Sequence, residues 1–464
     1  MKIMLISPPN ILEGNVSEEE SFDNRTTPLD LATLGAVLEK KHEVKILDAL
    51  ALELNKEKIL QEIETFNPDL ICLTAFDRCR WGIDSANELS KYILNKNVGL
   101  IWAYKMELMI DSMKNNKNIS FAIYGDPEYT LLEIADKKNL KDIPGVIYRK
   151  GNKIIQNSPR NLIKNLDELP FPSRNLLDFN AYKRLPHELI KSPSYDMIVS
   201  RGCPYQCAFC LMNIVGGRIR RQRSPEKTVE EMKLLRLMGA KQIHFQDLTF
   251  TFERNWTVEF CERLIKENLG LIWTCQTRVD KVDFELLKLM RKAGCRSILY
   301  GIESLVQDSL DLIHKNTSVE DMKNAILLTK KAGIEARCSM MIGLPGEKKE
   351  SVLSTVNLLK KLNPAFVQFH TTMALPGTEL YEYPERFKGK ILTETLTKKF
   401  DISGKPFVPE DYKNEQEILD LQKQAYKEFY FRPKYILGRI FSKNQFSRNI
   451  KGIKIFLKLL NKKN

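Results

Sequence analysis

The sequence lacks any uncharged apolar run as long as the roughly 18 residues that a membrane-spanning helix needs. It also lacks the pattern of a secretory leader, because residues 1–6 pass directly into Ser7, Pro8 and Pro9, as in a strand followed by a loop. Nine cysteines among 464 residues are too few for a disulfide scaffold. These absences predict a cytoplasmic protein.

Acidic residues are missing after Glu428, in a chain whose formal net charge is +13 at pH 7. In residues 450–460, apolar residues recur at helical spacing among lysines, which predicts a basic amphipathic helix. That helix could make peripheral contact with an anionic membrane, or it could pack on the protein with its lysines in water. No nucleic-acid-binding motif accompanies the charge, so we expect no nucleic-acid partner.

Three cysteines, Cys203, Cys207 and Cys210, stand close together in one short segment. Three thiolates can bind three irons of a cubane [4Fe-4S] cluster and leave the fourth iron open to a ligand from outside the protein. A structural zinc ion is an alternative, but zinc needs four ligands, and His187 and His244 lack the usual paired spacing. Buried thiols without a metal are the third possibility.

Residues 200–210 read Ser-Arg-Gly-Cys-Pro-Tyr-Gln-Cys-Ala-Phe-Cys. This stretch resembles the cluster loop of the radical S-adenosylmethionine (SAM) enzymes, whose pattern is Cys-x3-Cys-x-aromatic-Cys, with Phe209 in the aromatic position. The resemblance implies a [4Fe-4S] cluster on the three cysteines, SAM as a second cofactor, and an electron donor of the ferredoxin or flavodoxin type. It also implies reductive cleavage of SAM to a 5′-deoxyadenosyl radical that removes hydrogen from a substrate.

Residues 1–143 alternate short apolar runs with segments of helical spacing. This alternation predicts an α/β fold with a doubly wound, Rossmann-like parallel sheet, in which ligands lie beyond the carboxyl ends of the strands. Ser7 and Thr74 fall at such ends. The predicted strands are residues 2–6, 43–47, 69–73, 98–102 and 121–124, and the predicted helices are residues 29–40, 56–66, 83–94 and 129–136.

The order of these features resembles the cobalamin-binding domain attached to many radical SAM enzymes, with matches at residues 6–9, 28–34, 42–48 and 124–131. The Asp-x-His-x-x-Gly motif of other cobalamin proteins is absent, as it is in many radical SAM relatives. The family's Gly-Gly-rich loop after the fourth strand is also absent, because residues 101–107 read Ile-Trp-Ala-Tyr-Lys-Met-Glu. Side chains at these positions hinder close approach of a corrin to the backbone. The domain therefore either binds cobalamin or is a retained sheet that binds nothing or a smaller ligand.

Residues 144–192 have few periodic apolar positions, which predicts an irregular linker. Residues 193–385 then repeat six strand–helix steps, which predicts a partial (β/α)6 barrel of the TIM type, with its active site at the carboxyl ends of the strands. Residues 386–464 are expected to form a helical, basic C-terminal region. The predicted strands are residues 196–200, 242–246, 272–277, 297–301, 335–342 and 366–371, and the predicted helices are residues 228–237, 256–268, 284–293, 319–332 and 348–362.

As the resemblance implies, Phe209 of the cluster loop is a candidate cofactor contact, and four polar residues at or near these strand ends are candidate SAM contacts. Asp247 could accept a hydrogen bond from the SAM ammonium, although the family's Gly-Gly-Glu motif is missing there, or it could be a turn or helix-cap residue. Arg278 could hold the SAM carboxylate or form a salt bridge with Asp280 or Glu303. Glu303 could bind the ribose hydroxyls or the amine of SAM, since a buried carboxylate needs a partner. Ser339, on the fifth strand, is the fourth candidate.

Residues 343–347 and 373–381 resemble two further loops of the family, so the resemblance covers the chain to about residue 383. It implies a radical SAM enzyme that performs cobalamin-assisted methylation or rearrangement of an unactivated carbon. The alternatives are a radical SAM enzyme without cobalamin and, from another class, a non-catalytic iron–sulfur redox protein. We expect a small-molecule substrate, or a lipid-like one if the basic tail meets a membrane. His314 and His370 could face it or be structural, and no residue is assigned a catalytic role.

Overall fold

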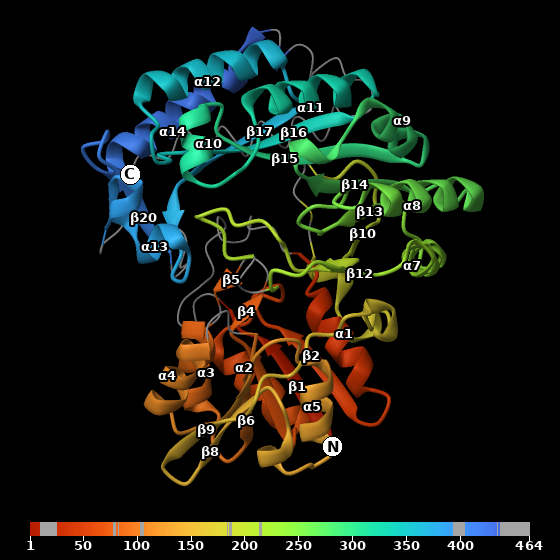
Figure 1. The fold of residues 1–464 in the computed structure, drawn as a ribbon. Coiled ribbons are helices and arrows are strands. Elements are labelled where there is room, and N and C mark those ends of the chain that lie inside the picture. Colours follow the sequence, from red (N-terminus) through yellow and green to blue (C-terminus); the bar gives the residue numbers. More distant parts are fainter. Residues whose placement is uncertain are drawn as a thin grey trace. The chain divides into compact units, whose positions relative to one another are not determined.

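The computed structural model describes residues 1–9, 26–77, 80–81, 83–102, 106–182, 184, 188–212, 216–392, 404–433 and 435–436. The chain divides into two compact units. Unit 1 holds residues 1–183, 211–221 and 399–403, and unit 2 holds residues 184–210, 222–398 and 404–464. Figure 1 shows the helices and strands of both units in sequence colours.

Unit 1 is built on a seven-stranded sheet in the order β2-β1-β3-β6-β7-β8-β9, whose first five strands are parallel. Helices cover both faces, α1 and α5 on one and α2, α3 and α4 on the other (Figure 1). The predicted doubly wound sheet is thus confirmed. The parallel strands are β1 (Lys2–Ser7), β2 (Glu43–Asp48), β3 (Leu70–Thr74), β6 (Asn97–Ile101) and β7 (Ile119–Ile123), and the helices are α1 (Leu29–Leu38), α2 (Lys56–Phe66), α3 (Ile83–Tyr92), α4 (Met106–Asn115) and α5 (Glu128–Ala135).

Several elements of unit 1 were not predicted from the sequence, among them α4 and the strands β8 (Val146–Lys150) and β9 (Lys153–Gln156). The two strands form an antiparallel hairpin at the edge of the sheet, within residues that we expected to be an irregular linker. Lys150 pairs with Lys153 across a two-residue turn, in which Gly151 has a φ of 59°. A Gly-Asn pair between two short apolar runs is a hairpin signal, so this strand pair was readable from the sequence.

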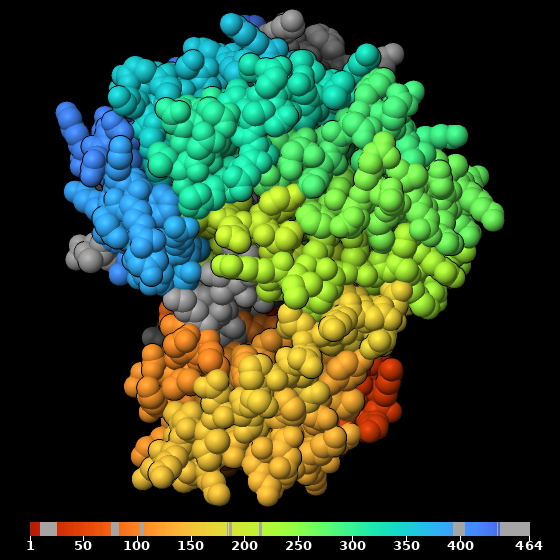
Figure 2. Space-filling model, viewed as in Figure 1, coloured from red at the N-terminus to blue at the C-terminus, as the bar shows by residue number. Residues whose placement is uncertain are grey.

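Unit 2 contains a six-stranded sheet in the order β10-β13-β14-β15-β16-β17, in which every neighbouring pair is parallel. Spatial order follows chain order and helices connect the strands, as predicted for the partial barrel. In Figure 2, residues of α11 and α12 form part of the visible surface of unit 2. The strands are β10 (Ser194–Met197), β13 (Gln242–Phe245), β14 (Ile272–Thr277), β15 (Cys295–Glu303), β16 (Glu335–Ile342) and β17 (Phe366–Thr371), and the helices are α7 (Pro225–Leu237), α8 (Arg254–Glu267), α9 (Phe284–Lys292), α11 (Val319–Lys331) and α12 (Lys349–Leu362).

The edge strand β17 is covered by tyrosines of α14 (Glu415–Tyr430). The Tyr430 hydroxyl donates to the Val367 carbonyl at 2.6 Å and accepts from the Val367 N–H at 3.0 Å. Tyr426, one helical turn earlier, makes the same pair of bonds with Phe369 at 3.2 and 3.1 Å. These bonds satisfy backbone groups that an edge strand would otherwise expose, and so they block pairing with another chain.

We expect Tyr430→Phe to destabilise the protein by about 1–3 kcal/mol, because both backbone groups of Val367 lose their partner. The matched control is Tyr383→Phe, since Tyr383 is 44% exposed. Its change should stay below about 0.5 kcal/mol. Urea unfolding followed by circular dichroism measures both. Equal effects of the two variants would mean that water replaces the tyrosine hydroxyl without cost.

The predicted basic helix at residues 450–460 lies outside the described residues, as does His187. The described part of the C-terminal region contains α14 and the strands β19 (Gly389–Ile391) and β20 (Lys405–Pro409), which form a small antiparallel sheet with β18 (Met373–Ala374). Among the described residues, no helix combines the length and the apolar character needed to cross a membrane.

Candidate active site

The cysteine-bearing segment, residues 203–210, has little regular structure, and its position is set by contacts with other loops. Ala208 is bound on both sides: its N–H donates to the Ile313 carbonyl at 3.0 Å, and its carbonyl accepts from the Leu380 N–H at 2.9 Å. Within the segment, the Cys210 N–H donates to the Cys207 carbonyl at 3.0 Å. Ile313, at the end of the short helix after β15, and Leu380, in the short helix after β18, therefore fix this cysteine loop at the carboxyl ends of the barrel strands.

The three thiols of this loop are partly exposed, whereas the other described cysteines are buried. Burial raises the pKa of Cys261 and Cys275 well above the usual value, so these thiols stay protonated. Burial also raises the pKa of Cys207, but nearby Lys315 and Arg278 oppose that shift by favouring the thiolate. Because the thiolate is the form that binds metals, Cys207 with its two nearby cations is better suited to bind a cluster than the buried Cys261 and Cys275.

Nowhere in the described part of the chain do three or more His, Cys, Asp or Glu side chains gather as the ligands of a metal ion would. The thiolates of a cubane bind different irons, so they need not converge on one point. The fit of the loop to a cluster accordingly depends on its three accessible thiols and on the cations beside Cys207.

Arg278 holds the cysteine loop from the end of β14. Its Nε lies 2.8 Å from the Asp280 carboxylate, which confirms the salt bridge that was one of two expectations. Its Nη2 donates to the Lys315 carbonyl at 2.9 Å, and its guanidinium lies 3.7 Å from the ring centroid of Tyr205. Tyr205 belongs to the cysteine loop, so Arg278 links that loop to the loop after β15 through a charged, planar contact. Its predicted contact with SAM stays a prediction.

Glu303 forms a buried ion pair with Lys315, whose Nζ lies 2.9 Å from Glu303 Oε1. Burial by itself lowers the pKa of Lys315, but Glu303 and Cys207 outweigh burial and leave the pKa raised, so the lysine is a cation. Glu303 has a φ of 65° and ends an irregular stretch of the β15–β16 pairing that begins at Gly301. A Cβ on Gly301 would lie 2.6 Å from Glu303 Oε1, so only glycine leaves room for this pair.

Sequence reasoning found Glu303 but missed Lys315, because no spacing pattern marks a loop lysine as buried. It also missed the contacts of Asp247, which is buried and accepts a hydrogen bond from the Val199 N–H at 3.1 Å and another from the Ser200 hydroxyl. Neither expectation for Asp247 included this support of the strand that leads into the cysteine loop. Its contact with SAM stays a prediction.

Phe209 and Ser339 lie near the carboxyl half of β16. The Phe209 ring packs against Ile313, Met341 and Leu344, which anchors the last turn of the cysteine loop. Ser339 is partly exposed between two buried residues of β16. The predicted contacts of Phe209 and Ser339 with a cofactor stay predictions.

The loop that follows β16, residues 343–347, is tied to the end of β15 by a buried carboxylate. The Ser304 hydroxyl donates to Glu347 Oε1 at 2.5 Å, and the Leu344 N–H donates to Glu347 Oε2 at 3.2 Å. Burial raises the pKa of Glu347 to about 7. Ser304, next to Glu303, and the loop of residues 343–347 therefore form one connected rim at the carboxyl ends of β15 and β16.

In unit 1, Ser7 and Thr74 end β1 and β3, as predicted, and are buried. The order β2-β1-β3 reverses the winding direction here, and ligands of doubly wound sheets bind at such a switch point. At the end of the neighbouring strand β6, Trp102 takes a φ of 58°, a conformation that usually favours glycine. Its indole packs against the core under α1 and α5.

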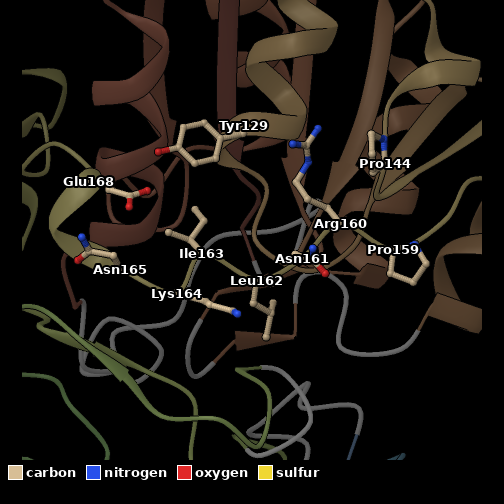
Figure 3. Close-up of a pocket in the computed structure, with 10 residues that line it drawn as sticks. All are labelled: Tyr129, Pro144, Pro159, Arg160, Asn161, Leu162, Ile163, Lys164, Asn165 and Glu168. Carbon is tan, nitrogen blue, oxygen red and sulfur yellow. The ribbon is translucent and has the colours of Figure 1, made fainter.

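A separate cavity of about 460 Å³ lies in unit 1, lined by Tyr129 of α5 and the polar segment of residues 159–168 (Figure 3). Arg160 borders it, but its guanidinium pairs with Glu133 and its Nε donates to the Thr130 hydroxyl at 2.7 Å. Of the two cationic side chains that line this cavity, Arg160 and Lys164, the first is therefore engaged within unit 1.

Replacing Arg278 by lysine keeps the charge but removes the planar fork and the stacking on Tyr205. We expect a loss of about 2–3 kcal/mol in the unfolding free energy of the apoprotein and a lower iron content after anaerobic reconstitution. The matched control is Arg254→Lys, because Arg254 forms an exposed ion pair with Asp283. Urea unfolding and iron analysis measure the effects. Full iron loading of the Arg278 variant would show that the loop holds its shape without this contact.

The sequence matches one protein-family model and several known proteins. Residues 197–359 match the family model described as the radical SAM superfamily. An uncharacterised methyltransferase of Pyrococcus horikoshii is 32% identical, over 98% of this chain and 98% of its own length. The anaerobic magnesium-protoporphyrin IX monomethyl ester cyclase of Rubrivivax gelatinosus is 26% identical, over 88% of this chain and 76% of its own.

Among solved structures, the radical S-adenosylmethionine methyltransferase TsrM of Kitasatospora setae, with cobalamin and a [4Fe-4S] cluster bound, has a TM-score of 0.69 to this chain. The alignment covers 93% of this chain and 89% of TsrM at 17% identity. At that identity the likeness concerns the fold, and it extends over both units.

Proposed function

Because the chain belongs to the radical SAM superfamily, we propose that it reductively cleaves SAM at a [4Fe-4S] cluster held by Cys203, Cys207 and Cys210. The observation that carries the proposal is the loop of three accessible thiols at the carboxyl ends of the barrel strands. When bound, the cluster supplies the electron that splits a carbon–sulfur bond of SAM and yields a 5′-deoxyadenosyl radical.

The residues around the cysteine loop position it, favour its thiolate form and provide the proposed contacts to SAM. Arg278 and the backbone contacts of Ala208 hold the loop in position. Lys315 and Arg278 favour the thiolate of Cys207, the form that binds iron. The proposed SAM contacts are those predicted from the sequence: Phe209, Asp247, Arg278, Glu303 and Ser339. Glu303 is the best placed, because its charge lies close to Cys207.

We further propose that the reaction is a cobalamin-assisted methylation or rearrangement of an unactivated carbon. The methyltransferase relative and the fold shared with TsrM support methylation, and the cyclase relative supports rearrangement. In unit 1, Ser7 and Thr74 flank the switch point at which a corrin would fit the fold. When bound, cobalamin would supply methyl transfer.

One observation favours a second candidate, a radical SAM enzyme whose unit 1 does not bind cobalamin. Trp102 stands where the family's glycines begin, and its side chain occupies space that a glycine would leave open. The proposed partners are a small-molecule substrate and an electron donor. A cytoplasmic location with membrane contact through residues 450–460 stays a prediction from sequence.

The first experiment reconstitutes the full chain with iron and sulfide without oxygen and adds SAM and dithionite. We expect 5′-deoxyadenosine, measured by mass spectrometry, from the wild type and at least a hundredfold less from Cys207→Ala, since three thiolates are needed to hold the cluster. The control Cys261→Ala, in the buried core, should keep the activity. A loaded cluster without 5′-deoxyadenosine would instead support a non-catalytic redox protein.

A second experiment decides between the two candidates for unit 1. Hydroxocobalamin is added during reconstitution and excess is removed by gel filtration. We expect a corrin absorption band at about one corrin per chain, because the fold keeps the switch point of doubly wound sheets. A wild type without the band, and a Trp102→Gly variant that gains it, would identify the cobalamin-independent enzyme.

A further inference from the structure

The barrel strands separate two faces with different chemistry. Residues of a strand alternate between faces, and in β16 and β17 Cys338, Met340, Val367 and Phe369 belong to the buried core that packs on helices. The residues between them, such as Gln368, therefore face the inside of the partial barrel. There Ser339 and Gln368 are partly exposed, and His370 is exposed.

The same alternation holds on the neighbouring strands. On β13 and β14, Ile243, Phe245, Trp273 and Cys275 lie in the helix-side core, so His244, Gln246, Thr274 and Gln276 face inward. The His244 ring nitrogen Nδ1 and the Thr274 hydroxyl lie 2.7 Å apart. The interior of a TIM barrel is ordinarily filled by branched apolar side chains. Here amides, hydroxyls and imidazoles stand beside a few apolar side chains, namely Leu299, Met341 and Phe366.

Charged side chains at the two ends of this inner face are already paired. At the carboxyl end, Glu303 pairs with Lys315, and Arg278 pairs with Asp280. At the amino end, Glu188 lies between Arg184 at 3.4 Å and Arg337 at 3.5 Å, and Arg184 also pairs with Asp196; all four side chains are less than 10% exposed. At the amino end of the inner face, two arginines are therefore balanced by two carboxylates.

His370 keeps surface open to water, but protein atoms surround much of the ring; this crowding lowers its pKa and favours the neutral imidazole, and the charge of Glu303 only partly opposes that shift. A neutral imidazole carries one donor and one acceptor, and the glutamine amide of Gln368 carries both types as well. The inner face thus offers several neutral donors and acceptors between two sets of paired charges.

We propose that the inner face binds an uncharged part of the substrate that is rich in hydrogen-bond donors and acceptors, such as an amide, a hydroxyl or a neutral nitrogen heterocycle, and that Gln368 and His370 position it toward the cysteine loop. This assignment rests on the proposed function and names its substrate class. It disfavours a lipid-like substrate, since apolar surface against these side chains would leave their polar atoms without partners. A site that hydrogen-bonds its substrate rejects molecules without the matching groups more strongly than an apolar pocket rejects molecules that carry an extra group.

The test measures binding to the reconstituted holoenzyme with SAM by equilibrium dialysis, with three probes: N-acetyl-L-tryptophanamide, which is neutral and carries amides, 1-dodecanol, which is apolar, and coproporphyrin, which is anionic. We expect the amide probe to bind most tightly. His370→Ala and Gln368→Leu should each weaken it about tenfold, the equivalent of one lost hydrogen bond. His370→Gln, which keeps a donor and an acceptor, should recover part of the loss.

The matched control is His314→Ala, because His314 is exposed and pairs with Glu379 on the surface. Its binding of the amide probe should equal that of the wild type. Preferred binding of 1-dodecanol or coproporphyrin, or unchanged amide binding in both inner-face variants, would overturn the assignment. Gln368→Leu keeps the test decisive if His370→Ala does not fold. Formation of 5′-deoxyadenosine from SAM alone is recorded separately, so its absence counts against the proposed function and not against the inner face.

Discussion

The backbone of Ala208 is the point on which the site depends. A loop that carries three cluster ligands has no hydrogen-bonded ladder of its own, so its shape must be imposed by its neighbours. One bond to Ile313 and one from Leu380 hold the residue between Cys207 and Phe209. Stacking of Arg278 on Tyr205 holds the other half of the loop. Together these contacts place the thiols where several strand ends meet, which is the usual location of active sites on this type of barrel.

The buried pair of Glu303 and Lys315 is a costly way to build this rim. Desolvating two charges offsets much of their attraction, so such a pair adds little net stability and serves mainly to define one arrangement. The chain adopts unusual backbone to make it, with Glu303 at a φ of 65° and no room for a Cβ at Gly301. Strained backbone of this kind usually occurs at functional sites. Here Lys315 and Glu303 both lie close enough to Cys207 to affect its pKa.

Features that depend on residues close together in the chain could be predicted from the sequence. Apolar alternation identified both parallel sheets, the cysteine spacing identified the cluster loop, and the short separation of Arg278 and Asp280 allowed their salt bridge to be anticipated. Partners brought together by folding escaped prediction, because Lys315 meets Cys207 and Arg278, and Glu188 meets Arg337, only in the folded chain. The hairpin of β8 and β9 is different: its Gly-Asn turn was visible, but it lay in a stretch with little other periodicity.

The polar inner face raises the question of what stabilises a barrel whose interior is not an apolar core. Inward residues such as Gln368 and His370 gain little from burial, since they are exposed in whole or in part. Apolar burial is instead concentrated on the helix side, where Trp273, Tyr300 and Phe369 are almost fully enclosed. The open edge at β17 is closed by tyrosine hydroxyls, and the amino end by paired charges. Because stability comes from these outer contacts, the inward positions are free to be chosen for binding.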